Sequence, residues 1–275
     1  MSRAALVAAM IAIGCGGTAA PAPTAPAPAP APIAAAAPAP PTAAPDRWRD
    51  VDPARLWQRV AVVGASVSAG FAAPRVADRV RGSLVAIDDD VVLDAANLLM
   101  FRDPWGDGAR QVDAAIGHHA SLVLAIDFLF WYAYQPGDAA ARAASLERGL
   151  AELARLDVPL AVGDVPDMRQ ADPRMLPAAV VPSPAELDAL NSRVRAWAAA
   201  RPRTAVLPLH AWSARLATDE PVELAPGDTV AARRLLFVDG LHVNPLGLGW
   251  MLVQIDVQLE RELGVPIDAV TFARP

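Results

Sequence analysis

The stretch that decides the fold is Arg59-Val60-Ala61-Val62-Val63-Gly64-Ala65-Ser66-Val67-Ser68-Ala69-Gly70. Four apolar residues end at Gly64, and Ser66 follows two positions later, ahead of Gly70. An apolar run that stops at a glycine predicts a buried parallel strand, and the small residues after it predict a tight turn into a helix. Ligands of open α/β sheets bind beyond the carboxyl ends of the strands, so Ser66 stands where chemistry is usually done.

Further apolar runs alternate with amphipathic segments along the rest of the chain. They predict a second strand beginning at Val91 and strands over 121–127, 158–162 and 205–209. Helices are expected over 73–81, 109–118, 138–157, 183–200 and from 244 to just before 264, with a loop over 101–108. Asp138, Ser183 and Asn244 are the expected N-caps, and proline follows the last two. The pattern predicts a three-layer, doubly wound α/β domain with a mainly parallel five-stranded sheet.

A second chemically suggestive stretch is Phe237-Val238-Asp239-Gly240-Leu241-His242-Val243-Asn244-Pro245. A serine hydrolase needs an imidazole to take the hydroxyl proton and a carboxylate to orient that imidazole. Asp239 and His242 supply both, three residues apart, ahead of a capped helix. Two other interpretations are a loop carboxylate that caps backbone N–H groups and a metal pair, for which no third ligand is evident. The remaining histidines are expected at a helix end (His118 and His119) and at the end of the fifth strand (His210).

The composition excludes several classes of function. The 24 basic residues are all arginine, which removes lysine-based catalysis and any P-loop. A glycine-rich strand–helix turn can also bind phosphate, but Gly64 to Gly70 fits neither known glycine spacing. The net charge is −6 without a basic cluster, so a nucleic-acid partner is not expected. Ser66 can also be an ordinary turn residue, as serines in such turns are common.

The N-terminal part of the chain resembles a bacterial export signal. Arg3 precedes the apolar run Ala4 to Ile13, which is too short to span a bilayer, and Ala12-Ile13-Gly14-Cys15 resembles a lipobox. Cys15, the sole cysteine, is then the expected lipidation site; an ordinary cleaved signal is the alternative. Residues 16–45 are rich in Ala-Pro pairs and predict an extended spacer. We therefore expect a signal over 1–14, a tether over 15–45 and a folded domain over 46–275, exported and membrane-anchored or else secreted.

Two motifs together resemble those of the SGNH (GDSL-type) hydrolases. Val62 to Gly70 resembles the family's first motif, a strand followed by Gly-Asp-Ser, and Asp239 to Asn244 resembles its last, Asp-x-x-His. The resemblance runs from about Arg59 to Gln258. It implies the family's flavodoxin-like α/β fold and a triad in which Ser66 is the nucleophile, His242 the base and Asp239 its partner. The family needs neither a metal nor another cofactor for this chemistry.

The chain departs from the family pattern at two places. The motif's aspartate before the serine is Ala65, a change expected to cost local hydrogen bonding rather than the nucleophile. The third motif, Gly-x-Asn-Asp, whose asparagine helps bind the oxyanion, is replaced by Asp127-Phe128-Leu129-Phe130. The loss of one oxyanion donor costs roughly 10²–10³ in rate. A carboxylate at Asp127 would repel an oxyanion unless it were protonated or turned away.

Other groups are expected to complete the oxyanion hole and the pocket. The Ser66 N–H should serve in any case, Asn97 is the expected side-chain donor, and the second-motif glycine corresponds to Gly106 or Gly108. Candidate pocket residues are Asp127 and the aromatic residues Trp105, Phe128, Phe130, Trp131, Tyr132 and Tyr134, which more often form core and rim. The expected activity is ester hydrolysis on a lipid, glycan or small-molecule ester. The alternative is a surface binding protein of the same fold with weak catalysis.

Overall fold

The computed structural model describes residues 48, 50–84, 91–225 and 227–263, all of which belong to the unit Pro40–Pro275. The expected signal, the lipidation site Cys15, the tether and the start of the domain at residue 46 lie outside the described residues. Within the described part, no helix is both long and apolar enough to cross a membrane.

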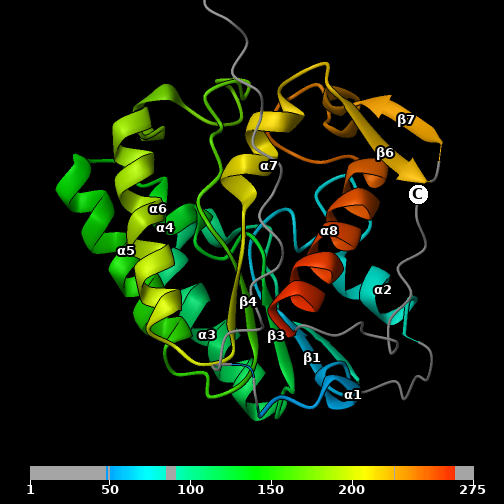
Figure 1. Ribbon diagram of the computed structural model, residues 1–275. Coiled ribbons are helices and arrows are strands. Elements are labelled where there is room, and N and C mark those ends of the chain that lie inside the picture. Colours follow the sequence, from blue (N-terminus) through cyan, green and yellow to red (C-terminus); the bar gives the residue numbers. More distant parts are fainter. Residues whose placement is uncertain (1–47, 49, 85–90, 226, 264–275) are drawn as a thin grey trace, which may run out of the picture. The chain divides into compact units, whose positions relative to one another are not determined.

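A five-stranded parallel sheet forms the centre of the domain (Figure 1). Its strands are β1 (Val60–Val62), β2 (Val92–Asp94), β3 (Leu122–Ala125), β4 (Leu160–Gly163) and β5 (Thr204–Leu207). They are arranged in the order β2-β1-β3-β4-β5, and every neighbouring pair is parallel. The order reverses at β1, so the carboxyl ends of β1 and β3 flank the point where doubly wound sheets bind ligands. The predicted fold class is confirmed.

Helices cover both faces of the sheet, each with its own apolar core. One core joins α1 (Pro53–Leu56), α2 (Val76–Arg81), α7 (Leu209–Leu216) and α8 (Pro245–Leu263) to side chains such as Val60, Val62 and Leu124. The other joins α3 (Pro104–Gly117), α4 (Phe130–Ala133), α5 (Ala139–Leu153) and α6 (Pro184–Ala199) to side chains such as Ala61, Val63 and Val123. Successive residues of one strand therefore alternate between the two cores, as the pleat of a strand requires.

The predicted caps explain where the long helices begin. Asp138 accepts a hydrogen bond from Ala141 N–H at the start of α5. Ser183 and Glu186 form the expected capping box of α6, and Asn244 Oδ1 accepts from the N–H groups of Leu246 and Gly247 at the start of α8. Each cap satisfies backbone donors that have no partner inside the helix.

Several expected boundaries are shifted: the helix predicted over 73–81 begins at Val76, and the one predicted over 138–157 ends at Leu153. Two further shifts bear on the site. The loop predicted over 101–108 contains the start of α3, because Asp103 accepts from Gly106 N–H and Pro104 occupies the first helical turn. The fifth strand ends at Leu207, since Pro208 has no N–H to extend the ladder, and Leu209 already opens α7. Sequence analysis did not find the antiparallel hairpin of β6 (Pro221–Ala225) and β7 (Asp228–Ala231), nor the short helices α1, α4, η2 (Met100–Arg102), η3 (Ala178–Val180) and η4 (Ala232–Leu235).

Candidate active site

The turn that carries Ser66 continues directly from β1. Val63 N–H still donates to Leu124 O of β3 (3.0 Å), and the chain then reverses so that Ala69 N–H donates to Ala65 O and Phe71 N–H to Ser66 O. Glycine is favoured at the start of this turn, because Gly64 has a φ of 149° and a Cβ there would clash with Asp127 Oδ1. The turn leaves Ser66 half-buried at the carboxyl edge of the sheet.

Asp127, which follows β3, holds the same turn from the neighbouring strand. Its Oδ1 accepts from Ala65 N–H (2.9 Å) and from the Ser68 hydroxyl (2.6 Å), and its Oδ2 accepts from Val67 N–H (2.8 Å). The side chain is buried, so these bonds replace water as the carboxylate's partners. The hydrogen bonding expected to be lost at Ala65 is therefore supplied from β3. The carboxylate oxygens are directed at the donors of the turn.

Gln111 of α3 fixes the other side of the turn. Its Oε1 accepts from Gly64 N–H (2.6 Å) and its Nε2 donates to Gly64 O (3.1 Å). Asn97 N–H also donates to Gly64 O (3.0 Å). Backbone groups that the end of β1 leaves without a strand partner are thus satisfied by a buried amide and by the loop after β2, as buried polar groups require.

The acid and the imidazole come from a compact loop ahead of α8. Leu236 and Val243 form an antiparallel bridge at its base, and Phe237 N–H donates to His242 O (2.8 Å). Gly240 adopts a φ of 62°, a conformation that favours glycine. Asp239 Oδ1 accepts from the N–H groups of Leu241 (2.9 Å) and His242 (3.0 Å), which orients the carboxylate before it reaches the imidazole.

A continuous hydrogen-bonded chain joins Asp239, His242 and Ser66. His242 Nδ1 lies 2.8 Å from Asp239 Oδ2, and His242 Nε2 lies 2.9 Å from Ser66 Oγ. Burial alone would raise the pKa of Asp239, but the hydrogen bonds from His242 and Leu241 outweigh it and hold that pKa below its usual value. An ionised carboxylate cannot donate, so Nδ1 carries the proton and the Nε2 lone pair faces the serine hydroxyl. The Phe71 ring stacks on the imidazole with centroids 4.1 Å apart and limits its rotation.

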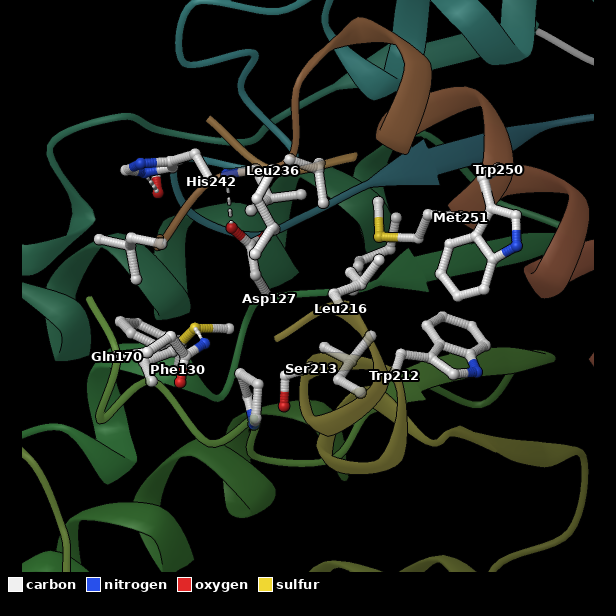
Figure 2. Close-up of a pocket in the computed structure, with 18 residues that line it drawn as sticks. Asp127, Phe130, Gln170, Trp212, Ser213, Leu216, Leu236, His242, Trp250 and Met251 are labelled. Atoms are coloured by element: carbon white, nitrogen blue, oxygen red, sulfur yellow. Dashed lines mark hydrogen bonds between the residues drawn. The ribbon is translucent and has the colours of Figure 1, made fainter. Parts of the chain in front are cut away.

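An apolar cavity begins at Ser66 and His242. Figure 2 shows His242 at one end and the indoles of Trp212 and Trp250 at the other, with Asp127 between them. Asp127 and Phe130, both expected from the sequence to line the pocket, do line this cavity. The walls contributed by α7 and α8 were not expected, because their apolar residues carry only the pattern of an ordinary amphipathic helix.

The other aromatic candidates lie elsewhere. Trp105 is exposed and packs under the Arg148 guanidinium, 4.4 Å from the ring centroid. Trp131 contacts the rings of Phe101 and Phe130 outside the cavity wall. The side chains of Phe128, Tyr132 and Tyr134 belong to the core between the sheet and α3–α6.

The expected oxyanion donors are placed as follows. Gly106 N–H donates to Asp103 as part of the cap of α3, and Gly108 lies inside that helix, where a Cβ would meet the Tyr132 hydroxyl. Asn97 sits at the carboxyl edge beside Gly64, as expected, but its Nδ2 donates to Asp107 Oδ2 (2.8 Å). Ser66 N–H has no hydrogen-bond acceptor among residues 50–84, 91–225 and 227–263.

The other three histidines do not reach Ser66. His118 caps the end of α3 and accepts from Arg59 at its carbonyl (2.8 Å), and His119 follows it, as expected for a helix end. Arg59 precedes β1, so this pair lies at the opposite edge of the sheet. His210 is in α7, where its N–H donates to Asp164 (2.7 Å), rather than at the end of a strand.

Comparison with known proteins gives likeness of fold at low identity. No family model matches the chain, and no curated protein matches it. The psychrotrophic esterase EstA from Pseudoalteromonas sp., in a structure inhibited by monoethylphosphonate, is 12% identical with a TM-score of 0.43, over 75% of this chain and 99% of that one. A putative acylhydrolase from Bacteroides fragilis NCTC 9343 is 11% identical with a TM-score of 0.46, over 75% and 86%. A GDSL-like lipase from Bacteroides thetaiotaomicron VPI-5482 is 13% identical with a TM-score of 0.45, over 80% and 95%.

At such identities and TM-scores, the case for any chemistry rests on the geometry of this chain's own site.

Proposed function

We propose that this chain is a serine ester hydrolase of the SGNH type, with Ser66 as nucleophile, His242 as general base and Asp239 as the residue that orients His242. One observation carries the proposal: Ser66 Oγ, His242 and Asp239 form an unbroken chain with contacts of 2.9 and 2.8 Å. Nucleophile, base and orienting acid within hydrogen-bond reach are the signature of an activated serine.

The reaction follows from this arrangement. His242 Nε2 takes the proton of Ser66 as Oγ attacks the ester carbonyl, and the carbonyl π electrons move onto oxygen to give a tetrahedral oxyanion. When the oxyanion collapses, the bond to the alcohol breaks and His242 returns the proton to the departing alkoxide. Water, deprotonated by the same nitrogen, then attacks the acyl-enzyme and releases the acid with Ser66 restored. Asp239 stays ionised and stabilises the imidazolium that forms at each step.

The developing oxyanion needs donors at this edge of the sheet. Ser66 N–H fits that role, because it has no acceptor among the residues that the structure describes. Asn97 remains our proposed second donor through the amide N–H that does not bind Asp107.

One observation favours the alternative of a binding protein with weak catalysis. A carboxylate, Asp127, begins the stretch that stands in place of the family's Gly-x-Asn-Asp motif, and it lines the same cavity as Ser66. An uncompensated negative charge there would oppose the oxyanion. The four donors that surround its oxygens reduce that opposition, which is why we rank hydrolysis first.

The decisive experiment is labelling with a fluorophosphonate probe. The parent protein should form a covalent adduct on Ser66, while the Ser66→Ala variant should form none and His242→Ala should label far more slowly. A peptide map that places the adduct on another residue, or a parent inert to both the probe and model esters, would refute the proposal in favour of the binding protein.

We also propose, from the sequence alone, that the chain is exported and anchored through Cys15. A Cys15→Ser variant expressed in a bacterial host should move from the membrane fraction to the soluble one, because stable anchoring requires more than one acyl chain and a diacylated cysteine supplies two. Identical fractionation of variant and parent would exclude this anchor.

A further inference from the structure

The cavity next to Ser66 is a narrow, blind space rather than an open groove. It starts at Ser66 and His242 and runs between the carboxyl ends of the central strands and the helices α7 and α8 (Figure 2). Its far end is formed by buried side chains, among them Leu216, Met251 and Trp250. Trp212 and Trp250 meet there edge to face, with ring centroids 5.9 Å apart, and close it.

The volume of the cavity limits the size of the group that can enter it. It is about 70 Å³, whereas a cavity needs roughly 10–15 Å³ to hold one water. The space therefore corresponds to roughly five waters.

The side chains of Ser213 and Asp127 in the wall are already engaged inside the protein. Ser213 Oγ accepts from Asp167 N–H (3.0 Å) and donates to His210 O (2.9 Å). Asp127 accepts four hydrogen bonds from the Ser66 turn. A sugar hydroxyl in this cavity would lose its water and find few hydrogen-bond partners, which is unfavourable. An alkyl chain loses nothing of this kind and gains from leaving water.

The position of the blind end decides which half of an ester occupies it. After the first step the alcohol must depart and water must enter, while the acyl group stays bonded to Ser66. A group buried in a blind cavity is poorly placed to leave first. The cavity therefore suits the group that stays.

We infer that this cavity is an acyl-chain pocket, and that the substrates are esters of unbranched medium-chain fatty acids rather than acetylated glycans. The inference rests on the proposed serine hydrolase function. Each methylene that enters the pocket should raise kcat/KM about fourfold, until the chain meets Trp212 and Trp250. For longer chains, further methylenes should no longer raise kcat/KM.

The test is a series of 4-nitrophenyl esters from acetate through butyrate, hexanoate, octanoate and decanoate to palmitate. The parent should prefer a medium chain over acetate by at least about 10²-fold in kcat/KM. Leu216→Trp and Met251→Phe, which fill the blind end, should each shift the optimum to shorter esters. Trp212→Ala, which opens that end, should shift it to longer ones. Trp105→Ala is the matched aromatic control, since Trp105 lies outside the cavity, and it should leave the profile unchanged.

Two readouts separate this inference from the proposed function. In one outcome, the parent protein labels at Ser66 with fluorophosphonate and yet prefers acetate, or shows a flat profile that the filling variants do not alter. That result would overturn the acyl-chain pocket without contradicting the proposed hydrolase.

If the parent protein proves inert, the Ser66→Ala protein is titrated with decanoate while tryptophan fluorescence is followed. Saturable quenching that Trp212→Phe weakens would support a chain-binding pocket in a protein that is not a hydrolase. Absence of quenching would overturn the pocket as well. Thermal unfolding of each variant checks that it is folded.

Discussion

The two halves of the candidate site are held in opposite ways. Asp239 and His242 are positioned largely by close neighbours, because among the described residues the carboxylate binds Leu241 N–H, His242 N–H and the imidazole of His242, all within three residues. Two contacts come from farther along the chain: Asp172 N–H donates to Asp239 O (2.8 Å) and the Phe71 ring stacks on the imidazole. Ser66 is positioned by residues far away in the sequence. Its turn is held by Asp127, about 60 residues downstream, and by Gln111, 47 residues from Gly64.

This difference determines how each half should respond to mutation. The bonds of the Asp239 carboxylate lie within its own loop, so a change at that carboxylate should alter the chemistry more than the stability of the domain. A turn held by two neighbouring elements shares its hydrogen bonds with the core. A change in Asp127 or Gln111 should therefore reduce both activity and stability.

The largest effect is expected for Asp239→Asn. The amide keeps the size of the side chain but no longer holds the imidazole in the tautomer that faces Ser66, and such a change costs about 10⁴ in kcat. Fluorophosphonate labelling should slow in parallel. Thermal unfolding at neutral pH should change little, since the loop retains its backbone bonds. A kcat within tenfold of the parent would show that Asp239 only caps the loop.

The same contrast explains what could be predicted from the sequence. Asp239 and His242 are three residues apart, so spacing alone brought them together, and Ser66 followed from the end of an apolar strand. The three-layer α/β fold also follows from the alternation of strands and capped helices. The contact between Ser66 and His242 spans 176 residues and was expected only because two family motifs share one edge of the sheet.

The role of Asp127 and the walls of the cavity could not be predicted. A carboxylate after a strand looks alike whether it binds a ligand or neighbouring N–H groups, and only the packing of β3 against β1 decides. Gln111 gave no signal, because a polar residue in an amphipathic helix is expected on the solvent side. The pocket depends on α7, a helix that was not predicted from the sequence.

A large effect on both activity and stability is expected for Asp127→Asn. An amide offers one acceptor oxygen, so its NH₂ would face the N–H groups of Val67 and Ser68 that now bind Oδ2. We expect a loss of about 1.5–3 kcal/mol in the free energy of unfolding and, through displacement of the serine, about 10² in kcat. Denaturant unfolding and ester kinetics measure the two. If kcat rises instead, the amide of the variant acts as an oxyanion donor, and the Asp127 carboxylate of the parent opposes the oxyanion.

An effect on activity alone is expected for Asn97→Ala. If the free amide N–H of Asn97 meets the oxyanion, its loss should lower kcat by about 10² with little change in KM, because the bond matters mainly in the transition state. Asn97→Asp is the informative partner variant, since it keeps the size and removes both donors. If the parent and Asn97→Ala have equal kcat but the variant has a lower Tm, Asn97 serves only to hold the Asp107 side chain in place.

The smallest effect is expected at Asp256 on α8, the helix that follows the Asp239–His242 loop. Burial, with a contribution from Glu260, raises the pKa of this carboxyl from 3.8 to about 7, and its Oδ1 has no hydrogen-bond partner within the described part of the chain. The folded protein then holds this proton more firmly than the unfolded chain does. The free energy of unfolding should therefore fall as the pH rises from about 4 to about 7, and stay lower above that window.

Asp256→Asn should raise Tm by at least about 2 °C at a pH of about 8, with a smaller gain at a pH of about 5, where Asp256 is largely protonated. The exposed Asp188→Asn on α6 is the charge-matched control and should show no such pH dependence. Neither variant should alter kcat, so a fall in kcat for Asp256→Asn would mean that the Asp239–His242 loop depends on α8 and is less self-contained than its hydrogen bonds indicate.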